Sequence, residues 1–223
     1  MRKLIALGIL LFPWKIRRLI YRNYFKYEID DSSYIGFSWL FPESLILCNE
    51  AKIGHLNYCK NIRLLKVGEY SILGSLNWIT GFPIIPNYTG HFSKEESRTP
   101  ELVLDEHSAI TSRHFIDCTN SVRIGSFSTV AGIRSQLLTH SIDIYESKQV
   151  SNRIEIGRYC FIGSSSIILK GTKIPDYSVL GSMSLANKQY PEKFALYAGV
   201  PAKKIKNLPE STKYFSRKTG FIK

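Results

Sequence analysis

The sequence predicts an all-β solenoid, a parallel β-helix of about six coils, with an amphipathic helix before it and a C-terminal cap after it. Two observations predict this fold. Apolar residues recur at every sixth position in the C-terminal half, at Ile156, Ile162, Ile168, Ile174 and Leu180. A small residue stands four positions after each of them, at Cys160, Ser166, Thr172, Ser178 and Ser184. This period belongs neither to a helix nor to an ordinary amphipathic strand.

The same frame runs through most of the chain, with short slips between blocks. The stretches "LKVGEYSIL", "VRIGSFSTV" and "IEIGRYCFI" mark these slips and share one pattern of apolar, glycine, aromatic and small residues. Each unit predicts a short strand and a tight corner, with the apolar and small residues pointing inward. Glycine permits the backbone angles of the corner that other residues resist. Since one coil cannot bury its own inner face, the coils must stack and both ends need caps.

Two segments break the frame, residues 80–103 and residues 134–153. Loops that leave a rigid scaffold are where binding and catalysis concentrate, so these two segments are the expected location of a site. The predicted organisation is a basic amphipathic helical segment over 1–30, a β-helix domain over 31–188 that carries both loops, and a cap with a basic tail over 189–223.

The composition supports a large core and an anionic partner. Hydrophobic residues make up 44% of the chain, and 30 Lys and Arg against 18 Asp and Glu give a net charge of +12. That charge suits a phosphorylated cofactor, an anionic membrane surface or a nucleic acid. We expect no nucleic-acid partner, because the basic residues cluster at the two ends without a recognised motif. The four cysteines show no zinc spacing, so we expect no metal and a reduced, cytoplasmic chain.

Residues 1–27 form a basic segment with two possible roles. The apolar run Leu4 to Phe12 is shorter than the roughly 20 residues that cross a bilayer, and no signal-cleavage pattern follows it. Pro13 then suits the first turn of a helix. That helix has apolar residues at helical spacing and basic residues elsewhere: Ile16, Leu19, Ile20, Tyr24 and Tyr27 against Lys15, Arg17, Arg18, Arg22 and Lys26. It either packs on the chain's own domain or a neighbouring subunit, or lies on the inner face of the cell membrane.

The hexads, together with "LYAGVPAKKIKNL" at 196–208, resemble the left-handed β-helix hexapeptide-repeat acyltransferases. The resemblance covers about residues 30–208. It implies a left-handed coil, a homotrimer and acetyl-CoA as the acyl donor. The segment "AGIRSQLLTHSIDI" further resembles the branch that O-acetylates bacterial polysaccharides, in the stretch that carries the catalytic histidine.

The catalytic prediction centres on His140, in the second loop. Transfer from a thioester to a hydroxyl or amine needs a base near neutral pH, which a histidine supplies, and the activated thioester requires no metal. Asp143 or Glu146 is the candidate to orient the imidazole. Asp117 is a further candidate, for orientation or for substrate binding. His114 occupies an inward position where a small residue is expected, so it is either a satisfied core residue or a second catalytic candidate.

The resemblance places coenzyme A along the last coils, between two subunits. The matching positions are Gly163, Ser164, Gly181, Ser182, Lys203 and Lys204. The alternative is that the glycines are only corner residues and the lysines a solvated tail. Trp78 stands just before the first loop, where it either stacks on an acceptor sugar or packs against the coil.

The sequence therefore predicts an acyl-CoA-dependent O-acetyltransferase that modifies a sugar hydroxyl in cell-surface polysaccharide synthesis, in the cytoplasm or peripherally at the inner membrane face. Two alternatives remain open. One is an N-acyltransferase acting on an amino nucleotide-sugar, and the other is a hexapeptide-repeat scaffold that binds a partner without catalysis.

Overall fold

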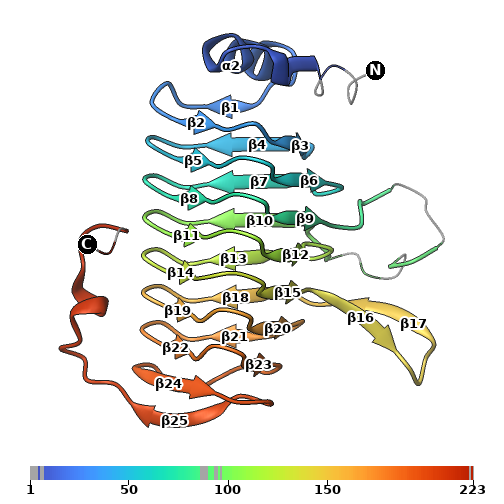
Figure 1. Cartoon of the computed structure of the whole chain (residues 1–223). Coiled ribbons are helices and arrows are strands. Elements are labelled where there is room, and N and C mark those ends of the chain that lie inside the picture. Colours follow the sequence, from blue (N-terminus) through green and yellow to red (C-terminus); the bar gives the residue numbers. More distant parts are fainter. Residues whose placement is uncertain are drawn as a thin grey trace.

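The computed structural model describes residues 5, 8–85, 90–92, 95, 97–220 and 222. It is a triangular solenoid whose three faces are parallel sheets (Figure 1). The first face has seven strands: β1 (Glu28–Ile29), β4 (Ser44–Leu47), β7 (Leu64–Val67), β10 (Glu101–Leu104), β13 (Val122–Ile124), β18 (Ile154–Ile156) and β21 (Lys173–Ile174). The second face begins with β2 (Tyr34–Ile35), β5 (Lys52–Ile53), β8 (Ile72–Leu73), β11 (Ala109–Ile110), β14 (Thr129–Val130), β19 (Phe161–Ile162) and β22 (Val179–Leu180).

The third face consists of β3 (Trp39–Phe41), β6 (Tyr58–Lys60), β9 (Trp78–Thr80), β12 (Phe115–Asp117), β15 (Gln136–Leu138), β20 (Ile167–Leu169) and β23 (Leu185–Ala186). Each coil contributes one strand to each face, so the 7-stranded first and third sheets correspond to seven coils. This is one coil more than the hexad count gives. The difference comes from three strands, β1, β15 and β23, whose buried residues Ile29, Leu137 and Ala186 lie outside the counted hexads.

The predicted inward positions form the core. Ile156, Ile162, Ile168, Ile174 and Leu180 are all buried, and so are the five small residues that follow them. The hydroxyl groups among the small residues bond to corner carbonyls, as Ser166 Oγ does to the Gly163 oxygen at 2.9 Å. Small polar side chains therefore fit the narrow corners without leaving a buried group unpaired.

The aromatic residue of each slip motif belongs to a continuous stack at the corner between the first and second faces. Adjacent rings lie 4.7–5.3 Å apart, in the order Tyr70, His107, Phe127, Tyr159, Tyr177 and Phe194. The C-terminal segment, with the short helix η2 (Lys213–Ser216), runs back along this corner (Figure 1). Phe215 is buried against Tyr177 and Phe194, so the tail covers the lower part of the stack.

The C-terminal cap is a hairpin on the second face. Strand β24 (Ala195–Ala198) pairs in parallel with β22, and β25 (Lys203–Asn207) pairs antiparallel with β24. Every residue of β25 is exposed. The solenoid therefore ends in a strand that carries three lysines, Lys203, Lys204 and Lys206.

The N-terminal cap consists of η1 (Ile9–Leu11) and α2 (Trp14–Asn23), which lie across the first coil (Figure 1). The sequence leaves open whether this segment packs on the chain or lies on a membrane. Arg17 and Tyr21 are buried and Ile20 packs against the core, whereas Ile16 and Leu19 are exposed. Arg17 turns inward because its guanidinium donates to the Ile35 and Gly36 oxygens, both at 2.9 Å, on the open edge of the first coil. Among the residues described, no helix is long and apolar enough to cross a membrane.

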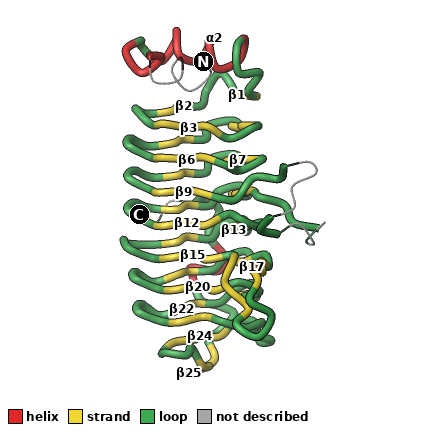
Figure 2. The backbone as a smooth tube through the Cα atoms, turned by 90° about the vertical axis from the view of Figure 1, so that its right-hand side faces the viewer, coloured by secondary structure: helices red, strands yellow, loops and turns green. Residues whose placement is uncertain are grey.

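Both departures from the coil leave the same edge, between the third and first faces (Figure 2). The first joins β9 to β10, so it occupies residues 81–100 between those strands. The second is a β-hairpin, β16 (His140–Asp143) and β17 (Lys148–Ser151), inserted between β15 and β18. The departure from the coil is therefore shorter than the loop expected at 134–153, because β15 lies within that range and completes the fifth coil before the hairpin begins.

Candidate active site

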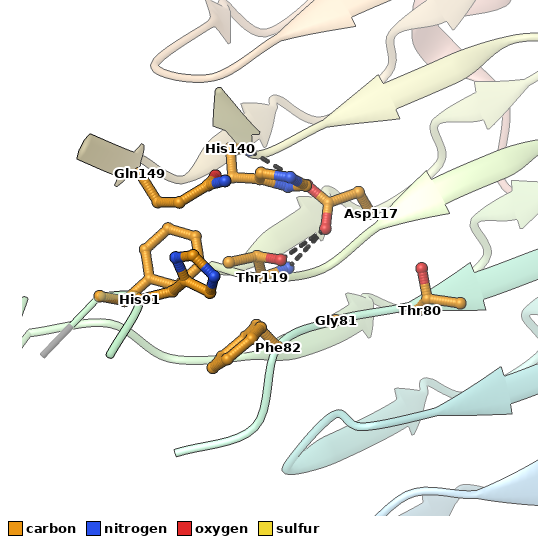
Figure 3. A pocket seen from close by; sticks show the side chains of 9 residues that line it. Thr80, Gly81, Phe82, His91, Asp117, Thr119, His140 and Gln149 are labelled. Atoms are coloured by element: carbon orange, nitrogen blue, oxygen red, sulfur yellow. Dashed lines mark hydrogen bonds and ion pairs between the residues drawn. The ribbon is translucent and has the colours of Figure 1, made fainter. Parts of the chain in front are cut away.

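A cavity of about 170 Å³ lies at this edge, over the corner of the fourth coil and between the loop and the hairpin (Figure 3). Three successive coils supply its lining, since β9, β12 and β15 are neighbours in the third face. The lining residues are Thr80, Gly81, Phe82, His91, Phe92, Asp117, Thr119, His140 and Gln149.

His140 and Asp117 form a close pair in this cavity. His140 Nδ1 lies 2.7 Å from Asp117 Oδ2, and the backbone N–H of His140 donates to the same oxygen at 3.1 Å. Asp117 ends β12, and His140 begins the hairpin just after β15. The parallel pairing of β12 with β15 places the two residues on neighbouring coils, so stacking of the coils creates the pair.

Asp117 is held as a carboxylate by a full set of donors. Its side chain is 4% exposed. Oδ1 accepts from the N–H and the hydroxyl of Thr119, and Oδ2 accepts from the N–H and the hydroxyl of Thr139 as well as from His140. Burial alone would raise the pKa of Asp117, but the hydrogen bonds from His140, Thr119 and Thr139 outweigh it and lower that pKa. The buried acid therefore stays ionised.

The pair also sets the chemistry of the imidazole. The hydrogen bond to Asp117 raises the pKa of His140, against a smaller opposing effect of burial. Because the carboxylate binds Nδ1, it fixes the neutral tautomer with the proton on Nδ1 and leaves Nε2 as the acceptor. No hydrogen bond to Nε2 is present among the described residues. A carboxylate that orients a histidine with a free Nε2 is the arrangement of a general base.

Two charged residues hold the first loop in place. Arg98 is buried, and its guanidinium donates to the Thr119 and Pro83 oxygens at 3.0 Å and to the Phe82 oxygen. Glu95 crosses to the hairpin, where Oε1 accepts from the N–H of Ser151 at 2.8 Å. These hydrogen bonds attach the first loop both to the fourth-coil corner and to β17. The loop and the hairpin, which form the two sides of the cavity, are therefore held in a fixed arrangement.

A larger cleft of about 730 Å³ adjoins the cavity and shares His91, Phe92 and Gln149 with it. Gln149 projects from β17 toward His140 (Figure 3). Its Oε1 atom is buried, with no hydrogen-bond partner among the described residues. A buried carbonyl oxygen without a donor is costly, so this atom is positioned to accept a hydrogen bond from a bound molecule.

His114 lies away from this cavity, in the corner between the second and third faces. It is 2% exposed and continues a ladder of polar side chains. Asn77 Oδ1 accepts from the N–H of His114 at 2.9 Å, and His114 Nδ1 accepts from the N–H of Ser135 at 3.1 Å. Its Nε2 faces Thr111 Oγ1 at 2.9 Å. Burial lowers the pKa of His114 to about 4, so it is a neutral ladder residue with both nitrogens occupied.

The other predicted candidates on this side of the molecule lie apart from His140. Asp143 Oδ1 accepts from the N–H groups of Tyr145 and Glu146, at 3.0 and 3.2 Å, and so caps the hairpin turn. Glu146 lies in the same turn and borders the larger cleft. The position predicted for Asp143 or Glu146 beside the imidazole is occupied by Asp117. Trp78 is 50% exposed on the outer surface of the third face, where it packs on Tyr58 with ring centroids 4.6 Å apart.

The predicted donor residues lie together at the corner between the second and third faces of the last coils. A Cβ atom on Gly163 would come within 2.4 Å of the Ser182 nitrogen, so the stacking of the coils requires glycine there. Gly181 lies against Ala198, whose register partner is Lys203. Lys204 pairs with Glu192. Ser164 is half-buried and Ser182 exposed, so the corner offers hydroxyl and ammonium groups to a ligand, but the third face separates it from His140.

Within the described residues, no group of three or more His, Cys, Asp and Glu side chains is placed to bind a metal ion. Several residues of the site were not anticipated from the sequence: Thr119, Thr139, Arg98, Glu95, Phe92 and Gln149. The small polar residues that follow β12 and β15 were the available signal for the two threonines. Nothing local marked Gln149 or Arg98, because their roles depend on a hairpin and a loop that meet only in the folded chain.

Comparison with known proteins identifies the fold. No family model and no curated protein matches the sequence. A variant of AntD, an N-acyltransferase from Bacillus cereus, in complex with dTDP-4-amino-4,6-dideoxyglucose and coenzyme A is similar, with 15% identity and a TM-score of 0.54. That similarity covers 79% of this chain and 83% of AntD. The solenoid therefore shares the fold of AntD, and it is a left-handed parallel β-helix.

Two further structures are similar at lower scores. The hexapeptide-repeat acetyltransferase VCA0836 from Vibrio cholerae is 16% identical, covering 93% of this chain and 90% of that one, with a TM-score of 0.47. The polysialic acid O-acetyltransferase OatWY is 18% identical, covering 84% and 90%, with a TM-score of 0.46.

Proposed function

We propose that the protein is an O-acetyltransferase that moves an acetyl group from acetyl-CoA to a sugar hydroxyl in the synthesis of a cell-surface polysaccharide. The single observation that carries this proposal is the His140–Asp117 pair at 2.7 Å, facing a cavity. A neutral hydroxyl is a poor nucleophile, and a histidine fixed by an ionised carboxylate is the group that activates it.

In the proposed reaction the acceptor hydroxyl donates its proton to Nε2 of His140 while its oxygen attacks the thioester carbonyl carbon. The negative charge of Asp117 stabilises the imidazolium that forms. The tetrahedral intermediate then collapses, the carbon–sulfur bond breaks, and His140 returns the proton to the departing thiolate. The products are the acetyl ester and free coenzyme A, so atoms and charge balance without a metal or a covalent enzyme intermediate.

The cavity favours a hydroxyl over an ammonium group. Asp117 is the one acidic residue in its described lining, and Thr119, Thr139 and His140 already occupy both carboxylate oxygens. No carboxylate of this cavity is therefore left to bind a protonated amine, and Glu95 and Glu146 line the adjoining cleft instead. The adjoining 730 Å³ cleft is large enough for further sugar units, and aromatic Phe92 lies on its wall.

A homotrimer is part of the proposal. Within one chain, the predicted coenzyme A corner around Gly163 and Gly181 lies on the opposite side of the third face from His140, so the donor and the base are too far apart to react. A second copy packed against that face would bring its own donor corner toward the cavity. The face carries an outward row of aromatic residues in register, Trp39, Tyr58, Trp78 and Phe115, and the last two are 50% and 40% exposed. Exposed apolar surface of this kind favours burial between copies. Sedimentation velocity of the wild type and of Trp78→Asp tests this, and a monomeric wild type would contradict it.

The function is tested by mixing the purified protein with acetyl-CoA and a panel of glycans, nucleotide sugars and amino sugars, and following the release of free thiol. Acetyl ester formed on a hydroxyl supports the proposal. An amide product on an amino sugar would replace it with N-acylation. No acceptor-dependent thiol release, together with no acetyl-CoA binding at millimolar concentration, would favour a non-catalytic scaffold.

A further inference from the structure

The inner face of helix α2 combines apolar side chains with hydrogen-bond donors, since Tyr21 and Arg17 are buried and Trp14 and Ile20 pack against the core. This face directs Arg17 onto the first coil, while Arg22 Nε donates to the Ile29 oxygen at 2.7 Å and Trp14 Nε1 to the Ser33 oxygen at 3.1 Å. These donors satisfy carbonyl groups along the open edge of the solenoid. An edge without such partners would be unstable or prone to pair with another chain.

The outer face of the same segment is apolar. Ile16 and Leu19 are three positions apart in α2, which places them on the same side of the helix, and Leu11 and Phe12 lie just before it. Leu11 is 87% exposed and Leu19 is 56% exposed, and Phe12, Ile16 and Tyr24 are exposed as well. We name these five residues, Leu11, Phe12, Ile16, Leu19 and Tyr24, the outer stripe. Five large apolar side chains exposed at one end of a solenoid indicate a surface that is covered in use.

We propose that the outer stripe docks the protein on an anionic lipid membrane, with the end of the solenoid resting on the bilayer surface. The charge of the segment selects this occupant. Residues 1–27 contain no acidic residue, and Lys15 is exposed beside the stripe. Arg18 and Arg22 keep part of their surface exposed although both pair with Asp31. An apolar helix face with basic neighbours is the pattern that lies in the interface of a membrane with negative headgroups.

The position of the stripe also fits this orientation. The helix with the outer stripe closes one end of the solenoid, and β25 closes the other (Figure 1). Neighbouring strands are about 4.8 Å apart, so the fourth-coil corner with Asp117 lies roughly 15 Å above the first coil. The cavity would therefore stand clear of the lipid at a fixed height and open sideways.

Vesicle co-sedimentation of the full-length protein tests the proposal. The probes are large unilamellar vesicles of phosphatidylcholine alone and of phosphatidylcholine with 30% phosphatidylglycerol. The test variant is Ile16→Ser/Leu19→Ser, and the matched control is Ile205→Ser, which removes an exposed isoleucine from β25 at the opposite end. Thermal unfolding of each variant, followed by circular dichroism, verifies that the fold is kept.

We expect the wild type and Ile205→Ser to bind the anionic vesicles at least tenfold more tightly than the neutral ones. We expect Ile16→Ser/Leu19→Ser to lose at least tenfold in affinity for the anionic vesicles. Equal binding of the double variant, equal binding to neutral vesicles, or no binding by the wild type would overturn the proposal. If the double variant instead lowers the oligomeric state in sedimentation velocity, the stripe is a contact between copies and the membrane proposal fails.

Discussion

Asp117 Oδ2 lies 2.7 Å from Nδ1 of His140 and also accepts from the N–H and the hydroxyl of Thr139, the residue just before that histidine. The carboxylate thus holds the backbone on which the imidazole is mounted as well as the ring itself. Both the position and the tautomer of His140 depend on one buried acid of the neighbouring coil.

Removal of the imidazole should abolish most of the acyl transfer. We expect His140→Ala to lower kcat by about 10³-fold, since general-base catalysis contributes roughly 10²–10⁴-fold. The KM for acetyl-CoA should change little. The control is His55→Gln, which alters an exposed histidine far along the solenoid. Wild-type turnover by His140→Ala with a validated acceptor would show that His140 is not the base.

The pH dependence of activity should report the Asp117–His140 bond. Because this bond raises the pKa of His140 above its ordinary value of 6.5, and the base must be neutral, kcat/KM should rise with pH through a pKa above 6.5. Asp117→Asn removes the carboxylate charge, so the acidic limb should move to lower pH while kcat falls at least about 10²-fold. An unchanged limb would mean that another group controls the titration. Steady-state kinetics from pH 5 to 9 measures both effects.

His114 should affect stability toward acid and leave catalysis unchanged. Its folded-state pKa of about 4 lies below the unfolded value of about 6.5, so the unfolded chain binds the extra proton first. Folding therefore gains stability from this residue above about pH 6.5 and loses it as the pH falls toward 4, by up to about 3 kcal/mol. His114→Asn places an asparagine where Asn57 and Asn77 already occur in the same ladder. This variant should lose less unfolding free energy between pH 7 and pH 4.5 than the wild type, and its kcat should stay near normal. Urea unfolding at pH 7 and pH 4.5 measures the stability effect. A large loss of kcat in this variant would instead show that His114 takes part in catalysis.

Gln149 should contribute to acceptor binding. Loss of one hydrogen bond to its buried Oε1 costs about 1 kcal/mol, so Gln149→Ala should raise the KM for the acceptor about five- to tenfold. The KM for acetyl-CoA should stay within about twofold. Gln189→Ala, at an exposed glutamine near the last coil, is the matched control. Equal rises in both KM values would indicate that the hairpin as a whole had shifted.

The sequence by itself determined the solenoid, most of its inward residues and the two loops that border the candidate site. The hexad is a local pattern, because each apolar residue such as Ile162 and each small residue such as Ser166 is required by its own corner. His140 could be singled out for the same reason, since it follows the point where the pattern breaks.

The tertiary structure decided which partner each of these residues has. Asp117 and His140 are 23 positions apart, and only the stacking register of β12 on β15 brings them together. Asp143, which is much closer in sequence, turns to the backbone of its own hairpin. The orientation of α2 was decided in the same way. Helical periodicity groups Ile16 and Leu19 with Ile20 without deciding which of them is buried. The carbonyls at the edge of the first coil bind Arg17, so that Ile16 and Leu19 stay exposed while Ile20 packs against the core.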